Sequence, residues 1–106
     1  MSRSTRRVPV VFAALGDETR LSLLERLSKG RRCSIAQLTD GTRLTRQAVT
    51  KHLRVLEKAG VVHATRAGRE SVFEFDPRPV AEVRTYLDRV SRQWDEALDR
   101  LRAYVE

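Results

Sequence analysis

The segment from Thr45 to Gly60 has the pattern of a helix with two chemically different sides, and this feature constrains the fold more than any other. At about 100° per residue, the side chains that can pack gather on one side, and basic or polar side chains gather on the other. The packing side contains Ala48, Val49, His52, Leu53, Val55, Leu56 and Ala59, and the opposite side contains Arg46, Gln47, Thr50, Lys51, Arg54 and Lys58. Such a helix must cover a core with one side and leave a cationic side open.

The ends of this helix carry suitable residues. Thr45 is a good N-cap, and Gly60 suits the left-handed position that follows a helix C-terminus. Arg and Lys bind phosphates, while Arg and Gln can also read the edges of guanine and adenine. The alternative is a solvated surface helix, which usually mixes acidic with basic residues, whereas only Glu57 does so here. Taken alone, the pattern leaves both interpretations open.

The net charge is distributed unevenly along the chain. The 106 residues carry a formal net charge of +7, and this length suits one domain whose stability is often completed by oligomerisation. Residues 1–60 contain 13 Arg and Lys against 5 Asp and Glu, whereas residues 61–106 contain 8 against 9. The excess positive charge therefore lies in the half with the two-sided helix, which favours a DNA-facing half and a neutral half for assembly.

Composition argues against several functional classes. A single cysteine, Cys33, cannot form an internal disulfide and suits a reducing cytoplasm. No stretch approaches the roughly 18 to 20 apolar residues of a membrane span, so a cytoplasmic protein without membrane association is expected. The chain shows no nucleophile and base arrangement and no phosphate-binding glycine loop. We therefore expect neither an enzyme nor a cofactor.

The residues before Thr45 predict three shorter helices. A flexible basic arm is expected over residues 1–7, followed by an apolar helical segment over residues 8–15. Asp17 is placed to N-cap a second helix and Ser34 a third. The second helix directs Leu21, Leu23, Leu24 and Leu27 toward the core. Residues 40–42 form a turn containing glycine, so the third helix and the two-sided helix predict a helix-turn-helix whose second helix is the reader.

The hydrophobic period changes after Gly60. Residues 61–66 and 71–76 are rich in β-branched and aromatic residues, and residues 67–70 between them suit a hairpin turn. A β-hairpin directly behind a reader helix is a wing. Asp76 and Pro77 then end the second strand and start a final helix, which is expected over about residues 77–105.

The final helix carries apolar residues at alternating spacings of three and four, which is typical of a coiled-coil seam. The seam consists of Val80, Val83, Leu87, Val90, Trp94, Ala97, Leu101 and Tyr104, and Leu98 and Val105 widen it. We interpret it as a homodimer surface, assisted by residues 8–15; the alternative is packing on its own domain. The predicted fold is mainly α with a β-hairpin wing, in the order ααααββα, as one winged helix-turn-helix domain over residues 8–106.

This order of elements resembles the ArsR-type winged-helix repressors of bacteria, and the resemblance covers nearly everything from Val8 onward. Residues 15–21, LGDETRL, look like the opening motif of that family. Residues 47–62, QAVTKHLRVLEKAGVV, look like its reader helix and the exit into the wing, and Gly68-Arg69 matches the wing tip.

The resemblance implies a homodimer that binds double-stranded operator DNA of approximate dyad symmetry and represses transcription until a signal releases it. Arg46 and Gln47 are the candidates for base readout, and Lys51 and Arg54 for phosphate binding. The full set of expected DNA contacts is Thr45, Arg46, Gln47, Thr50, Lys51, His52, Arg54, Arg66 and Arg69. The expected dimer interface contains Val8, Val11, Phe12, Val83, Leu87, Val90, Trp94, Leu98, Leu101 and Val105.

The metal-binding motifs usual in this family are missing. Its metal sites use a Cys-x-Cys-type pair before the reader helix, or His and acidic residues on the terminal helix. The first location here has Cys33 alone, and the terminal helix has neither His nor Cys. Thiophilic metals need thiolates, and zinc takes mainly imidazole or thiolate, so no metal site is expected.

Cys33 has two interpretations. Arg31, Arg32 and the helix N-terminus that follows would favour a thiolate and hence a redox switch, whereas a small semi-buried residue at a helix start is the alternative. Two other functions also stay open for the whole chain. One is a basic winged-helix module that binds nucleic acid without sequence preference, as an architectural or RNA-associated protein, and the other is a protein adaptor. The effector is not identified by these residues.

Overall fold

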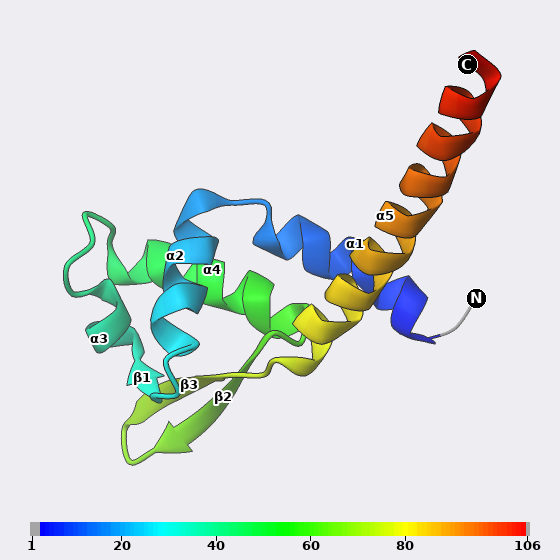
Figure 1. Cartoon of the computed structure of the whole chain (residues 1–106). Coiled ribbons are helices and arrows are strands. Elements are labelled where there is room, and N and C mark those ends of the chain that lie inside the picture. The colour runs from blue at the N-terminus through cyan, green and yellow to red at the C-terminus, as the bar shows by residue number, and fades with distance from the viewer. Residues whose placement is uncertain (1–2, 106) are drawn as a thin grey trace.

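Five helices and three short strands make up the protein, and the computed structural model describes them over residues 3–105, with side chains from residue 7 (Figure 1). The helices are α1 (Arg3–Leu15), α2 (Glu18–Leu27), α3 (Ile35–Thr39), α4 (Arg46–Lys58) and α5 (Arg78–Val105). The strands are β1 (Cys33–Ser34), β2 (Val62–Ala67) and β3 (Glu70–Phe75). The predicted mainly helical fold with a wing and a long last helix is confirmed, while β1 is an addition to the predicted order.

Three helices begin at the N-caps that the sequence predicts. The side chains of Asp17, Ser34 and Thr45 each accept a hydrogen bond from the backbone N–H three residues later, at 3.0, 3.1 and 3.1 Å. Gln37 also accepts one from the Ser34 N–H at 2.8 Å, which completes a capping box on α3. Gly60 has φ of +80°, the left-handed conformation expected after α4.

Helix α1 begins earlier than the sequence predicts. Residues 3–7 are helical, so the expected arm over residues 1–7 is wrong for them, and Met1 and Ser2 lie outside the described residues. The reason is tertiary: Nη1 of Arg7 lies 3.5 Å from Oε1 of Glu82 on α5, and the Val8 side chain is buried. Packing against α5 therefore stabilises a helix that continues through Pro9, a residue that local propensity disfavours there.

Strand β3 lies at the centre of a three-stranded antiparallel sheet, in the order β1-β3-β2. The wing pairs Val62 with Phe75 at its base and Ala67 with Glu70 at its tip. Its turn is only two residues long: Gly68 has φ of +63°, and no described non-glycine residue, Arg69 included, has positive φ, as in a type II′ hairpin turn. The strands therefore occupy residues 62–67 and 70–75, shifted by one residue from the predicted ranges.

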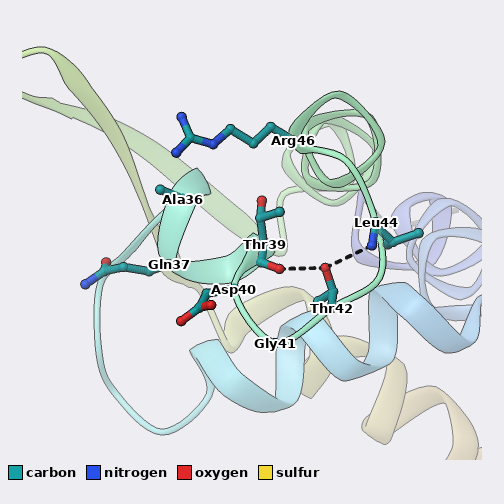
Figure 2. A pocket seen from close by; sticks show the side chains of 8 residues that line it. All are labelled: Ala36, Gln37, Thr39, Asp40, Gly41, Thr42, Leu44 and Arg46. Carbon is teal, nitrogen blue, oxygen red and sulfur yellow. Dashed lines mark hydrogen bonds between the residues drawn. The ribbon is translucent and has the colours of Figure 1, made fainter.

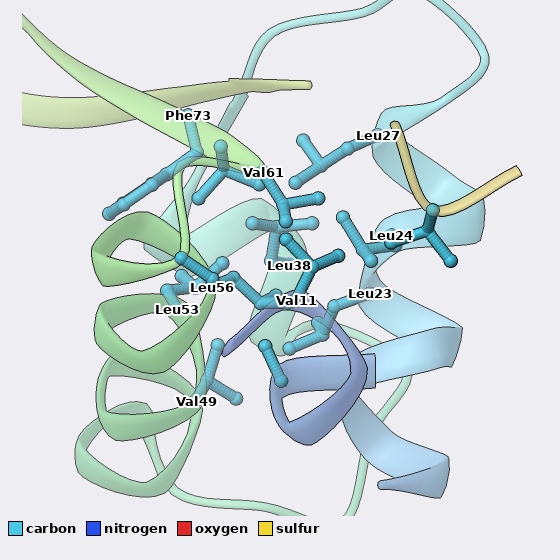
Figure 3. Packing of buried hydrophobic residues seen from close by; sticks show 14 of the residues in the cluster. Val11, Leu23, Leu24, Leu27, Leu38, Val49, Leu53, Leu56, Val61 and Phe73 are labelled. Atoms are coloured by element: carbon cyan, nitrogen blue, oxygen red, sulfur yellow. The ribbon is translucent and has the colours of Figure 1, made fainter. Parts of the chain in front are cut away.

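The core lies between α1, α2, α3, α4 and the sheet (Figure 3). Its fully buried side chains include Val11, Leu23, Leu27, Leu38, Val49, Leu53, Leu56 and Val61. Two side chains that the sequence assigns to the packing sides are exposed, Leu21 by 50% and Val55 by 42%. Each lies at the edge of the apolar side of its helix, where the neighbouring elements do not reach.

Helix α5 packs on the domain only near its N-terminus, and its C-terminal half projects away from the domain (Figure 1). Near the domain, Tyr86 meets Phe12 of α1 edge-to-face, with ring centroids 6.3 Å apart. Three residues of the predicted dimer interface, Val8, Val11 and Val83, are at most 5% exposed. That part of the prediction is wrong, because these side chains fill the protomer's own core.

Candidate nucleic-acid interface

The turn between α3 and α4 sets the direction of the reader helix. Gly41 adopts φ of +82°, which a residue with a side chain rarely tolerates. The hydroxyl of Thr42 donates to the carbonyl of Thr39 at 2.7 Å and accepts from the Leu44 N–H at 3.2 Å (Figure 2). These bonds fix the chain between the two helices, so α4 starts at a defined angle to α3.

An open hollow of about 520 Å³ lies between α3, the turn and the first residue of α4. Its lining combines backbone and polar groups from Gln37, Thr39, Asp40 and Thr42 with the side chain of Arg46. Figure 2 shows the Arg46 side chain extending from the start of α4 back toward Ala36. The structure therefore places a guanidinium at the open edge of the helix-turn-helix.

The cationic side of α4 faces outward. Arg46, Gln47, Lys51 and Arg54 are all exposed. Nη1 of Arg54 lies 3.5 Å from Oε1 of Glu57 on the same helix, a surface ion pair that is easily exchanged for another anion. Four of the predicted contact residues thus share one solvent-facing surface, which we call the reader surface.

The two threonines of the predicted set already have intramolecular partners. Thr45 Oγ1 accepts the capping bond from the Ala48 N–H, and Thr50 Oγ1 donates to the Arg46 carbonyl at 2.7 Å. Both hydroxyl groups retain further hydrogen-bonding capacity. Arg43, which the sequence analysis did not include, is exposed in the turn directly before α4. Its position two residues before the capping residue Thr45 was the signal available in the sequence.

His52 lies away from the reader surface. Its Nδ1 atom is 3.3 Å from Nη1 of Arg20 and 3.8 Å from Oδ2 of Asp17, both at the start of α2, and 25% of its side chain is exposed. Its inclusion among the DNA contacts is therefore wrong, and its assignment to the packing side of the helix is right. The hydrogen bond from the Arg20 backbone N–H lowers the pKa of the Asp17 carboxyl group below its ordinary value.

The wing brings two further arginines to an exposed edge. Arg66 and Arg69 are both exposed at the tip of the hairpin, and Nε of Arg66 donates to the carbonyl of Gly68 at 3.4 Å. The wing follows α4 after a turn of only three residues, with Gly60 in the middle. The predicted contacts on the hairpin therefore lie on a separate cationic edge behind the reader helix.

A buried carboxylate anchors the base of the wing. Asp76 is 7% exposed, and its Oδ2 atom lies 2.7 Å from Nε2 of His63 on β2 and accepts from Nη2 of Arg78 at 2.7 Å. Oδ1 accepts from the backbone N–H of Arg78 at 3.0 Å. The Arg78 side chain and then the His63 bond hold the pKa of Asp76 far below its ordinary value, against the opposing effect of burial. This cluster connects the wing to the first turn of α5.

Cys33 lies in β1, opposite Phe73, and its half-buried side chain packs against the core. Its thiol lies 3.9 Å from the Arg31 carbonyl, while Nε of Arg32 lies 3.6 Å from Oε2 of Glu74. The placement fits the second interpretation of Cys33, a small packing residue. Within residues 3–105, no three His, Cys, Asp or Glu side chains are grouped so that they could hold a metal ion.

The part of α5 beyond Val90 offers a continuous apolar strip. Trp94, Leu98, Leu101 and Val105 are 66, 52, 59 and 78% exposed, and Tyr104 lies beside them. Leu87 and Phe12 extend the strip toward the domain, with exposures of 46 and 40%. We call these seven residues the α5 strip.

None of the helices described over residues 3–105 has both the length and the apolar character needed to cross a membrane.

A helix-turn-helix with an exposed cationic reader helix and a β-hairpin behind it defines a winged helix-turn-helix, a DNA-binding class. Residues 15–64 match a family model described as a helix-turn-helix domain. The chain is 38% identical over 96 residues to the HTH-type transcriptional regulator Rv2034 of Mycobacterium tuberculosis, covering 90% of this chain and 86% of that protein. It is 29% identical over 88 residues to the transcriptional repressor SmtB of the same organism, covering 83% and 63%.

The solved structures point to the same family. An ArsR-like transcriptional regulator from Rhodococcus sp. RHA1 superimposes with a TM-score of 0.84 at 30% identity, covering 99% of this chain and 98% of that one. The chain belongs to the ArsR-type family of winged helix-turn-helix transcriptional regulators. The predicted resemblance is confirmed, and the relatives are regulators rather than enzymes.

Proposed function

We propose that this regulator is a homodimeric repressor that binds double-stranded operator DNA with approximate dyad symmetry. The observation that carries the proposal is the reader surface, where Arg46, Gln47, Lys51 and Arg54 project from one capped helix. A reader helix fits the major groove, where Arg and Gln recognise bases and Lys and Arg bind phosphates. The name of the relative SmtB supports the repressor role.

Each residue of the interface has a proposed role. Arg46 and Gln47, at the N-terminal end of α4, read base edges, because the N-terminal residues of a recognition helix point into the groove. Lys51 and Arg54 bind phosphates, and the hydroxyl groups of Thr45 and Thr50 add hydrogen bonds beside them. Arg66 and Arg69 bring the wing to the flanking minor groove.

The α5 strip forms the dimer interface. A monomer rarely leaves such a row of large apolar side chains exposed, and a heptad spacing allows a second copy of α5 to cover it. A symmetric dimer presents two reader helices to two half-sites about ten base pairs, or a multiple of one helical turn, apart. Recognition of a dyad-symmetric site therefore requires the dimer.

A response to metals is not part of the proposed mechanism. The two histidines of the sequence face Arg20 and Asp76, and the Cys33 side chain packs against the core. Imidazole and thiolate groups already engaged in this way would have to leave their partners to ligate a metal.

Selection of bound sequences from a random pool of duplex DNA tests the function. A repressor of this kind selects a dyad-symmetric site and binds it roughly a thousandfold or more tightly than random duplex at physiological salt. A module without sequence preference would enrich no motif, and its affinity for random duplex would equal that for any selected sequence. Failure to bind duplex DNA at low salt would instead support the adaptor function.

A further inference from the structure

Arg20, in the LGDETRL motif, connects three helices through one guanidinium group. Its Nε donates to the carbonyl of Ala14 at 2.6 Å and its Nη2 to that of Ala13 at 3.2 Å, so it caps the C-terminal end of α1. Its Nη1 lies 3.3 Å from Nδ1 of His52 on α4. The backbone N–H of Arg20 is held by the Asp17 carboxylate at 3.0 Å. These four bonds use the donors of a single residue at the junction of α1, α2 and α4.

The bond to His52 also determines where the imidazole carries its proton. A guanidinium group has only donors, so Nδ1 of His52 must be the acceptor, and the proton of the neutral ring lies on Nε2. The Asp17 Oδ2 atom, 3.8 Å from the same nitrogen, is already bonded to the Arg20 backbone. In the neutral ring, the contact with Arg20 therefore favours the tautomer with the proton on Nε2.

Helix α1, which Arg20 binds at its C-terminal end, also contacts α5, the helix of the proposed dimer interface. Arg7 of α1 pairs with Glu82 of α5, and the ring of Phe12 meets that of Tyr86. The same α1 ends at the two carbonyl groups that Arg20 binds. Helix α1 thus contacts α5 along its length and, at its C-terminal end, Arg20, which in turn reaches His52 on the packing side of the reader helix.

We propose that Arg20 is a positioning residue for operator binding: it holds the reader helix at a fixed orientation relative to α1 and α5. The inference rests on the proposed function, because it concerns the spacing of two reader helices in a dimer. Arg20 does not lie on the reader surface and has no direct contact with DNA in this scheme. It acts by fixing α4, so that both readers meet successive major grooves together.

The Arg20→Lys variant separates this role from a contribution of charge. Lysine keeps the positive charge, but its single ammonium group cannot span the Ala13 and Ala14 carbonyls and the His52 ring at once. The affinity of Arg20→Lys for the selected operator is expected to fall about tenfold or more. Sedimentation should show that the variant remains a dimer. Equal operator affinity for wild type and Arg20→Lys would overturn the positioning role while leaving the proposed function standing.

A pair of His52 variants gives the matched control. His52→Asn keeps an acceptor close to the position of Nδ1, whereas His52→Leu fills the space without one. We expect His52→Asn to retain most of the operator affinity and His52→Leu to lose it. The double variant Arg20→Lys/His52→Leu should bind no worse than Arg20→Lys alone, because Arg20→Lys already removes the contact with His52. Fully additive losses would mean that the two residues act independently.

Two readouts distinguish positioning from simple loss of stability. One base pair inserted between the half-sites should weaken wild-type binding strongly and Arg20→Lys binding much less, because the variant no longer holds the reader spacing. Nitrogen NMR of the neutral imidazole should show a larger fraction of the Nε2–H tautomer in the free wild type than in Arg20→Lys. The Nδ1–H tautomer in the wild type would contradict the contact itself. If the wild type selects no operator, the proposed function fails, and this role of Arg20 fails with it.

Discussion

Nε2 of His63 lies 2.7 Å from Oδ2 of Asp76, which joins the first strand of the wing to the residues that start α5. The same carboxylate binds the side chain and backbone of Arg78. A single buried anion therefore holds together a β-hairpin and a helix that have different proposed tasks, DNA contact and dimerisation. Loss of its charge should loosen both elements.

Asp76→Asn should destabilise the fold by about 1 to 3 kcal/mol at pH 7, because it leaves hydrogen-bonding partners of a buried carboxylate unsatisfied. Folding lowers the pKa of Asp76, so its ionised form stabilises the native state at pH values above the unfolded-state pKa, near 4. This stabilisation is lost as the pH falls below that value. Urea titrations at pH 7 and in steps below pH 4 should show the gap between the two proteins narrowing. A gap that stays constant with pH would exclude the ionised carboxylate as its cause.

Leu53→Ala should cost about 2 to 5 kcal/mol, since Leu53 is fully buried on the packing side of the reader helix and its truncation leaves a cavity. Leu21→Ala is the matched control: the same change at a side chain that is 50% exposed should cost well under half as much. Chemical denaturation of both variants measures the difference. Similar losses at the two positions would place Leu21 in the core, as the sequence pattern alone predicted.

Leu98→Glu should shift the protein from dimer to monomer, because it places a carboxylate in the middle of the α5 strip, where desolvating a charge is costly. Arg92→Glu introduces the same group on the opposite side of α5 and should leave the dimer intact. Sedimentation velocity over a range of concentrations measures the dissociation constant, which we expect to rise at least a hundredfold for Leu98→Glu only. Sedimentation of the wild-type protein as a monomer would contradict the proposed homodimer.

Arg46→Ala and Gln47→Ala should each weaken binding to the selected operator by about 1 to 3 kcal/mol and relax the base preference at one position. Lys51→Ala should lower the affinity for operator and random duplex alike and reduce the salt slope by about one. Fluorescence anisotropy with both DNAs at several salt concentrations separates the two behaviours. Uniform losses in all three variants would favour binding without sequence preference.

The helix boundaries could be predicted because their causes lie within a few residues. Asp17, Ser34 and Thr45 each bind a backbone N–H three positions later, so the signal and its effect share one helical turn. The two sides of α4 follow in the same way from helical periodicity. Strand β1 escaped prediction because two residues are too few to show an alternating pattern, and only β3 beside them makes them a strand.

The residues of the candidate site differ in the same way: helical periodicity predicts some of them, and long-range contacts determine the others. Four of the nine predicted DNA-contact residues share the reader surface, because their exposure depends only on the phase of α4. His52 was misassigned to that set because its role depends on Arg20, 32 residues away in sequence. Val83 was misassigned in a similar way: the heptad spacing is the same on both halves of α5, but α1 covers only the first half.

The caps, the two-sided reader helix, the hairpin and the apolar spacing of α5 can all be predicted from the amino-acid sequence, because each arises from interactions within a few residues. The start of α1 at Arg3, the burial of Val8, Val11 and Val83, and the contact between Arg20 and His52 are visible only in the folded chain. Burial and long-range hydrogen bonds depend on which elements pack together in space. The residues next to a given position in the sequence do not show which elements those will be.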